Sequence, residues 1–436
     1  MTVVELLRQL LRTDTVNPPG NEGRAVQILE DFLGSAGLQV RIEKSPEGRP
    51  NLVARIEGPR DRPALVLLSH TDVVAVEPEH WSRDPFGGEI HDGHVWGRGA
   101  LDMKGIGALH AVAAAELARS GKTPQRELIL AAVADEEAGG AQGAAWLIEE
   151  RADLVGMNEK RPPPDVLGEG GFGLTGLLER TLMPIVLGEK IAMKVKLKAR
   201  GSAGHGSLPP QEQAIETLAR VLAKISGHGT PRVHPIMREQ FRLMADVASG
   251  PRKAVFSALA SGAGPVVARA LKKPLRSSGA IASLLSDTIA TTTISGGYKN
   301  NVVPAEASAS LDCRLLPDSD EDDFLARLRK SAGDSIEIER LESQAGPVSD
   351  RSDLYPTLVR ASEALPSNPV VVPSLSPGFT DLRYFRKMGA HGYGWVPIAI
   401  PLELLGTIHG HDERVPVDEL ERGAKAMGEV VARAVT

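Results

Sequence analysis

The stretch "PALVLLSHTD", residues 63–72, decides how the first half of the chain folds. Its apolar run, residues 64–68, is typical of a strand that is buried on both faces, as in a parallel sheet covered by helices. The run ends on His70 and Asp72. In open α/β sheets, binding and catalytic residues lie just beyond the carboxyl ends of such strands. The pair therefore stands where a site is expected, although a polar strand end that faces solvent would explain one such pair taken alone.

The composition narrows the class of protein. With 436 residues the chain exceeds what one hydrophobic core usually organises, so we expect two domains. A formal charge of -6 gives no reason to expect nucleic acid or an anionic membrane as a partner. Cys313 is the only cysteine, so no disulfide can form within the chain. No apolar run reaches the about 18 residues of a membrane span, and charges interrupt the N-terminal apolar pattern, unlike a signal peptide. We expect a soluble, cytoplasmic protein.

The pattern of segments changes twice along the chain. Residues 1–190 alternate strand-like and helix-like segments, which predicts an open, mostly parallel sheet with helices on both faces. Residues 191–342 have the order strand, helix, two strands, helix, strand, which predicts an inserted ferredoxin-like α+β domain. Residues 343–436 return to α/β character and complete the first domain, which is then discontinuous. Within the second domain, residues about 228–285 are extra, and we expect their short amphipathic helices to pack on that domain.

Three further stretches place carboxylates at a helix start or a strand end: "GRGALDMKG" (97–105), "VADEEAGG" (133–140) and "VLGEGGFG" (166–173). Taken singly, each has a simple structural explanation, such as a helix N-cap or a solvated loop. If the strands belong to one parallel sheet, however, these carboxylates meet His70 and Asp72 at one edge. So much acid in one place can remain ionised only beside a cation. The carboxylates that would meet there are those of Asp102, Glu136, Glu137 and Glu169.

The mixture of side chains indicates the kind of cation. Carboxylates with imidazole, and without thiolate, suit zinc, manganese or cobalt in hydrolytic use. More carboxylates than one metal requires indicate two metals that share a bridging carboxylate and activate a water, with one carboxylate left free to take its proton. Other chemistry is disfavoured, because "GRGALDMKG" lacks both nucleotide-binding fingerprints and no G-x-S-x-G nucleophile motif is present.

Eight motifs, in order along the chain, resemble those of the two-zinc amidohydrolase family, which contains aminoacylase, succinyl-diaminopimelate desuccinylase, carnosinase and carboxypeptidase S. The resemblance covers nearly the whole chain, and the insertion looks most like that of the carboxypeptidase S and N-acyl amino acid hydrolase branch. The motifs are "SHTDVV", "GRGALDMKG", "ADEEAGG", "GEGG", "GSAGHGSLP", "NVVP", "GFTDLRYFR" and "HGHDERV".

The resemblance implies a ligand set for two zinc ions, with Co2+ or Mn2+ as alternatives. Asp165 competes with Glu169, but only Glu169 matches the family's "EGG" pattern. In the last motif His409, rather than His411, matches the ligand position. The implied ligands are His70 and Glu169 for one ion, Glu137 and His409 for the other, and Asp102 as the bridge.

The resemblance also implies roles for residues beside the ions. Asp72 would accept a hydrogen bond from the second nitrogen of His70. Glu136 would be the general base, which deprotonates a water and later protonates the leaving amine. His205, from the second domain or lid, would stabilise the oxyanion. In this family that histidine commonly reaches the site of the other subunit through lid dimerisation. The residues that would bind the substrate's carboxylate are Asn301 and Arg383.

We therefore expect a zinc-dependent hydrolase that cleaves an amide or peptide bond in a small substrate with a free α-carboxylate, as a carboxypeptidase or dipeptidase does. The alternative is an N-acyl amino acid amidohydrolase (aminoacylase) for apolar acyl groups, with the insertion folded over the cleft. A non-catalytic binding relative would be expected to lose the base or a ligand, and none is missing. An oxidoreductase is disfavoured by the missing dinucleotide fingerprint. The expected assembly is a homodimer formed through the lid.

Overall fold

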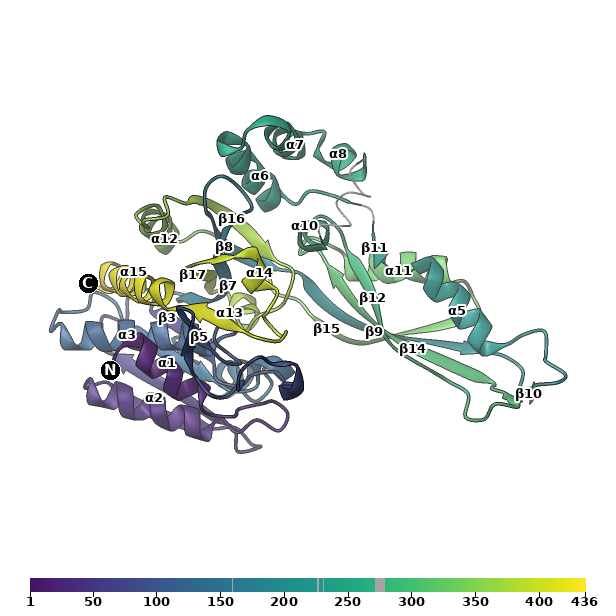
Figure 1. The fold of residues 1–436 in the computed structure, drawn as a ribbon, viewed down its shortest axis with the longest axis horizontal. Helices are drawn as coiled ribbons and strands as arrows, with labels where there is room; N and C mark the ends of the chain where they lie inside the picture. Colours follow the sequence, from purple (N-terminus) through teal and green to yellow (C-terminus); the bar gives the residue numbers. More distant parts are fainter. Residues whose placement is uncertain (159, 226, 230, 271–278) are drawn as a thin grey trace.

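The computed structural model describes residues 1–436 apart from 159, 226, 230 and 271–278 (Figure 1). Its largest element is an eight-stranded sheet with the order β1-β2-β6-β3-β7-β17-β8-β16. β3 pairs in parallel with β6 and β7, and β17 pairs in parallel with β7. β2 pairs antiparallel with both of its neighbours, β1 and β6. The prediction of an α/β fold with a mostly parallel central sheet is confirmed. The strands are β1 (Gln39–Lys44), β2 (Pro50–Ile56), β3 (Leu65–His70), β6 (Leu128–Val133), β7 (Asp165–Thr175), β8 (Leu182–Glu189), β16 (Val370–Ser376) and β17 (His391–Pro401).

β3 is buried on both faces, as its apolar run predicts. Leu65 and Leu67 belong to a core shared with helices α1, α2, α3, α12 and α15, whereas Val66 and Leu68 belong to a second core under α4 and α13. Helices therefore cover both faces of the sheet. The helices are α1 (Val3–Leu11), α2 (Gly23–Ser35), α3 (Lys104–Arg119), α4 (Ala144–Glu150), α12 (Leu354–Glu363), α13 (Leu382–Lys387), α14 (Leu402–Leu405) and α15 (Val417–Val435).

A small three-stranded sheet joins two distant parts of the first domain. In it β18 (Arg414–Pro416) pairs with β5 (His94–Trp96), which pairs with β4 (Ile90–His91). The main-chain N–H of Gly97 then donates to the carbonyl of Glu413 at 3.0 Å. The segment that leads to Asp102 thus lies beside the segment that follows His409.

The second domain, which we call the lid, is built on a second sheet with the order β11-β12-β14-β9-β15 and has its own apolar core. Without the short edge strand β11, the strand order and the two helices on one face are those of a ferredoxin-like fold. Figure 1 shows the lid extending away from the first domain, with β10 at its far end. The elements are β9 (Ile191–Arg200), β10 (Gly204–His205), α5 (Ala214–Ile225), β11 (Gly227–His228), β12 (Thr288–Gly296), β13 (Val302–Val303), β14 (Glu306–Leu315), α11 (Glu321–Ala332) and β15 (Ile336–Gln344).

The helical insertion does not pack as we expected, on the lid alone. Met237, Phe241 and Met244 of α6 share a core with Val370 and Val372 of β16, the edge strand of the large sheet. The apolar face of α6 covers a sheet face that would otherwise meet water, which explains this packing. Part of the insertion, 230 and 271–278, lies outside the described residues. Its helices are α6 (Pro235–Val247), α7 (Gly250–Ala260), α8 (Gly264–Ala270) and α10 (Gly279–Leu284).

The chain crosses between the two sheets at two places. It leaves the large sheet after β8 and enters the lid at β9, and it returns after β15. Across the described ranges, no helix is long and apolar enough to cross a membrane.

Candidate functional site

The predicted metal ligands come from separate elements that meet at one edge of the large sheet. His70 is the last residue of β3, and Glu169 lies in β7, just beyond the point at which β7 stops pairing with β3. Glu137 belongs to a short 3-10 turn after β6, Asp102 to the turn that precedes α3, and His409 to the turn between α14 and β18. Parallel strands and their following turns bring these side chains together, as the sequence predicts.

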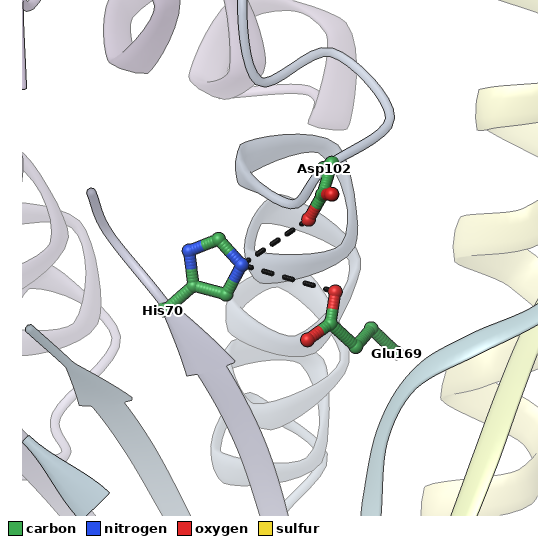
Figure 2. Close-up of side chains that lie close together, drawn as sticks. All are labelled: His70, Asp102 and Glu169. Carbon is green, nitrogen blue, oxygen red and sulfur yellow. Dashed lines mark hydrogen bonds and ion pairs between the residues drawn. The ribbon is translucent and has the colours of Figure 1, made fainter. Parts of the chain in front are cut away.

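The first group of donors consists of His70, Asp102 and Glu169. Nε2 of His70 lies 3.2 Å from Oδ1 of Asp102 and 3.8 Å from Oε2 of Glu169 (Figure 2). Figure 2 shows both carboxylates turned toward the same ring nitrogen. One donor atom from each residue lies within 4.8 Å of the others, which is compact enough to hold a metal ion.

The second group consists of Asp102, Glu137 and His409. Nε2 of His409 lies 3.1 Å from Oδ2 of Asp102 and 3.2 Å from Oε2 of Glu137. Asp102 therefore belongs to both groups and presents a different oxygen to each imidazole. This is the arrangement required of a bridging carboxylate.

The cluster concentrates partly buried carboxylates beside two imidazoles. Burial, with the charge of Asp102 nearby, raises the pKa of Glu169 to about 8. Hydrogen bonds to Asp102 and Glu137 raise the pKa of His409 to about 10. Oε1 of Glu137 is buried and has no hydrogen-bond partner among the described residues. Divalent cations would supply the charge that protons supply here, and donors of the imidazole and carboxylate type suit zinc, manganese or cobalt. The residues therefore fit a divalent cation in each group.

Asp72 differs in part from its predicted role. Nδ1 of His70 donates to the main-chain carbonyl of Asp72 at 3.0 Å, whereas the nearer carboxylate oxygen lies at 3.5 Å. The carboxylate instead accepts the main-chain N–H groups of Glu136 (3.2 Å) and Glu137 (3.1 Å) and the side-chain amide of Asn17 (2.8 Å). Burial alone would raise the pKa of Asp72, but these contacts and His70 hold it below its usual value. Asp72 thus fixes the tautomer of His70 through its main chain and the Glu136–Glu137 turn through its side chain.

Glu136 is a carboxylate beside the two groups that belongs to neither of them. It is buried, and its Oε1 has no hydrogen-bond partner in the part of the chain that the structure describes. Burial, followed by the charge of Glu169, raises its pKa well above the usual value. A carboxylate in such a setting binds a proton readily, which is the property of a general base that works near neutral pH.

His205 and Asn301 do not reach this site within the same chain. His205 lies in β10, at the far end of the lid in Figure 1. There its Nδ1 contacts the hydroxyl of Ser207 at 2.7 Å, and the N–H of Gly206 donates to the carbonyl of Asn301 at 2.9 Å. The structure therefore brings His205 and Asn301 close to each other and leaves both remote from the two donor groups.

Arg383 is buried and occupied by main-chain contacts. Its guanidinium donates to the carbonyls of Thr380 (2.8 Å) and Gly139 (3.0 Å), and it stacks on Phe379 with its carbon 4.5 Å from the ring centre. It thereby supports the turn that follows Glu137. The ring of Phe379 also lines the cavity beside Glu137, and the contact of Arg383 with a substrate carboxylate stays a prediction.

Arg314 of the lid is the guanidinium that we did not predict. A cavity of about 170 Å³ beside Glu137 is lined by Arg314, Lys194 and Phe379 among others, and Arg383 is not in its described lining. Arg314 is paired with Asp312 at 2.7 Å, and its Nη1 has no partner within the described ranges. The alternating pattern of β14 places Arg314 opposite the buried face of the strand, but the sequence does not show that this open face turns toward the site.

The fold is that of known metallohydrolases. A metallo-carboxypeptidase of the M20 family, Sso-CP2 from Sulfolobus solfataricus, superimposes with a TM-score of 0.74 at 20% identity, over 98% of each chain. Human carnosine dipeptidase 1 superimposes with a TM-score of 0.65 at 13% identity, over 98% of this chain and 96% of that one. At such identities the likeness establishes the fold alone.

Sequence comparison with curated proteins identifies the family. Mouse aminoacylase-1 is 29% identical over 431 residues, which cover 96% of this chain and 92% of the mouse protein. The N-fatty-acyl-amino acid synthase/hydrolase PM20D1 of Xenopus tropicalis is 30% identical over 438 residues, covering 96% of this chain and 83% of the frog protein. The sequence model of peptidase family M20/M25/M40 matches residues 66–433. The chain belongs to peptidase family M20/M25/M40, a family of metal-dependent hydrolases.

Proposed function

We propose that this protein is a two-zinc hydrolase that cleaves the amide or peptide bond of a small substrate with a free α-carboxylate. The observation that carries the proposal is the pair of donor groups that share Asp102, with Glu136 left free beside them. Two zinc ions, or Co2+ or Mn2+ in their place, would polarise the scissile carbonyl and lower the pKa of the attacking water. The residues that would hold them are His70 and Glu169, Glu137 and His409, and the bridging Asp102.

Glu136 is the general base of the proposed reaction. Its carboxylate takes a proton from the attacking water and returns it to the nitrogen of the leaving amine as the amide bond breaks. Asp72 positions the base for this transfer, because its carboxylate accepts the main-chain N–H groups of Glu136 and Glu137. Glu136 belongs to neither donor group, so a mutation of Glu136 can separate proton transfer from the binding of cations.

Arg314 is the residue that we propose binds the substrate's carboxylate. A guanidinium grips a carboxylate with two parallel hydrogen bonds, and Arg314 lines the cavity next to Glu137. Arg383, which the family resemblance implies for the same contact, packs on Phe379 of this cavity and is proposed as the second carboxylate-binding guanidinium. Replacing Arg314 with lysine should raise KM about tenfold or more with little change in kcat, because it weakens ground-state and transition-state binding alike. A fall in kcat at unchanged KM would assign Arg314 a different role.

His205 and Asn301 require a second subunit if they are to act in this reaction. They lie at the end of the lid, in a region with exposed apolar side chains such as Leu208 (81% exposed) and Tyr298 (84% exposed). A second subunit at this end of the lid would cover apolar surface that is otherwise exposed to water. We therefore propose a homodimer through the lid, in which His205 of one subunit stabilises the oxyanion in the site of the other. The cytoplasmic location that the sequence favours stays a prediction.

An N-acyl amino acid hydrolase is the second candidate, because relatives with about 30% identity along the chain carry that kind of name. The apolar insertion gives it no support, since the described lining of the cavity beside Glu137 contains no residue of 228–285. The deciding experiment is hydrolysis of dipeptides, N-acetyl amino acids and long-chain N-acyl amino acids by the zinc-loaded protein, with Glu136→Gln as control. Cleavage of dipeptides above the rest supports a carboxypeptidase or dipeptidase, and preference for long acyl groups supports an acylase. No cleavage in the presence of bound zinc would refute the proposed substrate class.

A further inference from the structure

Glu413 is a buried carboxylate, remote from any solvent, whose two oxygens are both engaged by the loop that carries Asp102. Oε1 accepts the main-chain N–H groups of Leu101 (2.7 Å) and Asp102 (3.0 Å). Oε2 accepts the N–H of Gly99 (3.1 Å) and Nη1 of Arg98 (2.7 Å). Glu413 thus fixes the main chain at the residue that belongs to both donor groups.

Arg98 extends this contact to the turn that carries His409. While Nη1 binds Glu413, Nη2 donates to the carbonyl of Gly410 at 2.6 Å, and the guanidinium lies 5.2 Å from the ring centre of Trp81. The side chain is buried, so water does not compete for these bonds. One guanidinium therefore joins the Asp102 loop to the residue next to His409.

The His409 turn needs such support. His409 and Asp412 have φ angles of 58° and 59°, in the left-handed region that side chains other than glycine seldom adopt. Such conformations persist only when the surrounding structure fixes them. The carboxylate of Asp412 accepts the N–H and the hydroxyl of Ser82, both at 2.7 Å, which holds the far end of the turn. Arg98 holds the near end, through the carbonyl of Gly410 that follows His409.

We propose that Arg98 and Glu413 form a clamp that sets the position of Asp102 relative to His409 and thereby the affinity for the cation that these two residues would share. The inference rests on the proposed two-zinc function. Neither residue belongs to a donor group, so both are positioning residues. Contacts behind metal ligands commonly change metal affinity by about 10- to 100-fold.

Two substitutions weaken the clamp while keeping the size of the buried side chains similar. Arg98→Lys keeps the buried positive charge but cannot bind Glu413 and Gly410 with a rigid fork. Glu413→Gln keeps the shape, but four N–H donors converge on its two oxygens, and a carboxamide offers only one acceptor. Arg386 is the matched control, since this buried arginine also joins a carboxylate, Glu189 (3.2 Å), to a carbonyl, Gly392 (3.1 Å), away from both donor groups.

The experiment measures zinc binding by the metal-free protein in competition with a chromophoric chelator, for wild type, Arg98→Lys and Arg386→Lys. We expect Arg98→Lys to weaken one of two binding constants by about 10- to 100-fold and to leave the other within about threefold. In a His409→Ala background the same change should add less than about threefold, because the affected ligand is already gone. Arg386→Lys should keep both constants. With Co2+ in place of zinc, Arg98→Lys should also shift the visible absorption of the affected ion.

Two results would overturn the clamp: wild-type affinities for both ions in Arg98→Lys, or a full effect of Arg98→Lys in the His409→Ala background. Glu413→Gln is the second variant, so that a folding defect in one protein does not decide the matter. Wild-type protein that binds fewer than two zinc ions would instead refute the two-zinc function, and the two failures are therefore distinguishable.

Discussion

The carboxylate of Asp72 can be replaced by the carboxamide of asparagine with almost no change in shape, which makes Asp72→Asn a test of how the site is built. One oxygen of Asp72 accepts the N–H of Glu136, and the other accepts the N–H of Glu137 and the amide of Asn17. An asparagine oxygen can replace only one of them. In the better orientation it keeps the two bonds to Glu137 and Asn17 and turns its own NH2 toward the N–H of Glu136.

The expected magnitude follows from that one lost bond. A buried donor left without an acceptor costs about 1–3 kcal/mol. The free energy of unfolding of the metal-free protein should therefore fall by about that amount, measured by urea unfolding beside wild type. The unpaired N–H belongs to the proposed base. Displacement of the base would cost the transition state, and not the free enzyme, up to the same amount, so kcat/KM should fall by up to about 150-fold.

Asp381 provides the control. It is also a buried carboxylate near the site, but neither of its oxygens has a hydrogen-bond partner among the described residues, and burial raises its pKa to about 7. Asp381→Asn therefore removes a poorly solvated acid without breaking a bond, and the free energy of unfolding should stay within about 0.5 kcal/mol or rise. Two results would refute the reasoning: a urea midpoint of Asp72→Asn equal to that of wild type, or equal destabilisation by Asp72→Asn and Asp381→Asn.

Three further predictions concern other parts of the molecule. Glu136→Gln should bind zinc as wild type does while kcat falls by about 10²–10⁴-fold, because proton transfer is lost and ligation is kept; retained turnover would contradict this. Removal of divalent cations by a chelator should lower the midpoint of thermal unfolding, since cations that bind only the folded protein stabilise it; an unchanged midpoint argues against resident metal. Cys313, whose pKa burial raises to about 12, should not react with thiol reagents at about pH 8 until the protein is unfolded, and rapid labelling of the native protein would show otherwise.

Local patterns were sufficient for the framework of the first domain. The apolar run of β3 is long enough to require burial on both faces, and Leu65 and Val66 indeed contribute to different cores. A parallel sheet then brings strand ends to one edge, so His70 and Glu169 could be predicted to meet from the order of segments alone. The ferredoxin-like order of the lid could be read in the same way, because its central strands β9 and β14 alternate buried and more exposed residues.

Docking of one element on another could not be read from local patterns. The apolar face of α6 indicates that another element covers it. The sequence does not show that this element is β16 rather than the lid. The same holds for Arg314, because alternation gives its face of β14 and only the placement of the lid turns that face toward Glu137. His205 and Asn301 show the converse, since motif matching associates them with the metal site, whereas both lie at the β10 end of the lid, far from the large sheet in Figure 1.

The sequence by itself determined which side chains are available at the sheet edge, because strand burial and residue type depend on neighbours along the chain. Only the tertiary structure decided how they are held. The carboxylate of Glu413 reaches the N–H of Asp102 from 311 positions away, and Asp72 holds the turn of Glu136 from 64 positions away. Such contacts form between segments that are far apart in the sequence and meet only when the chain is folded, so no local sequence pattern predicts them.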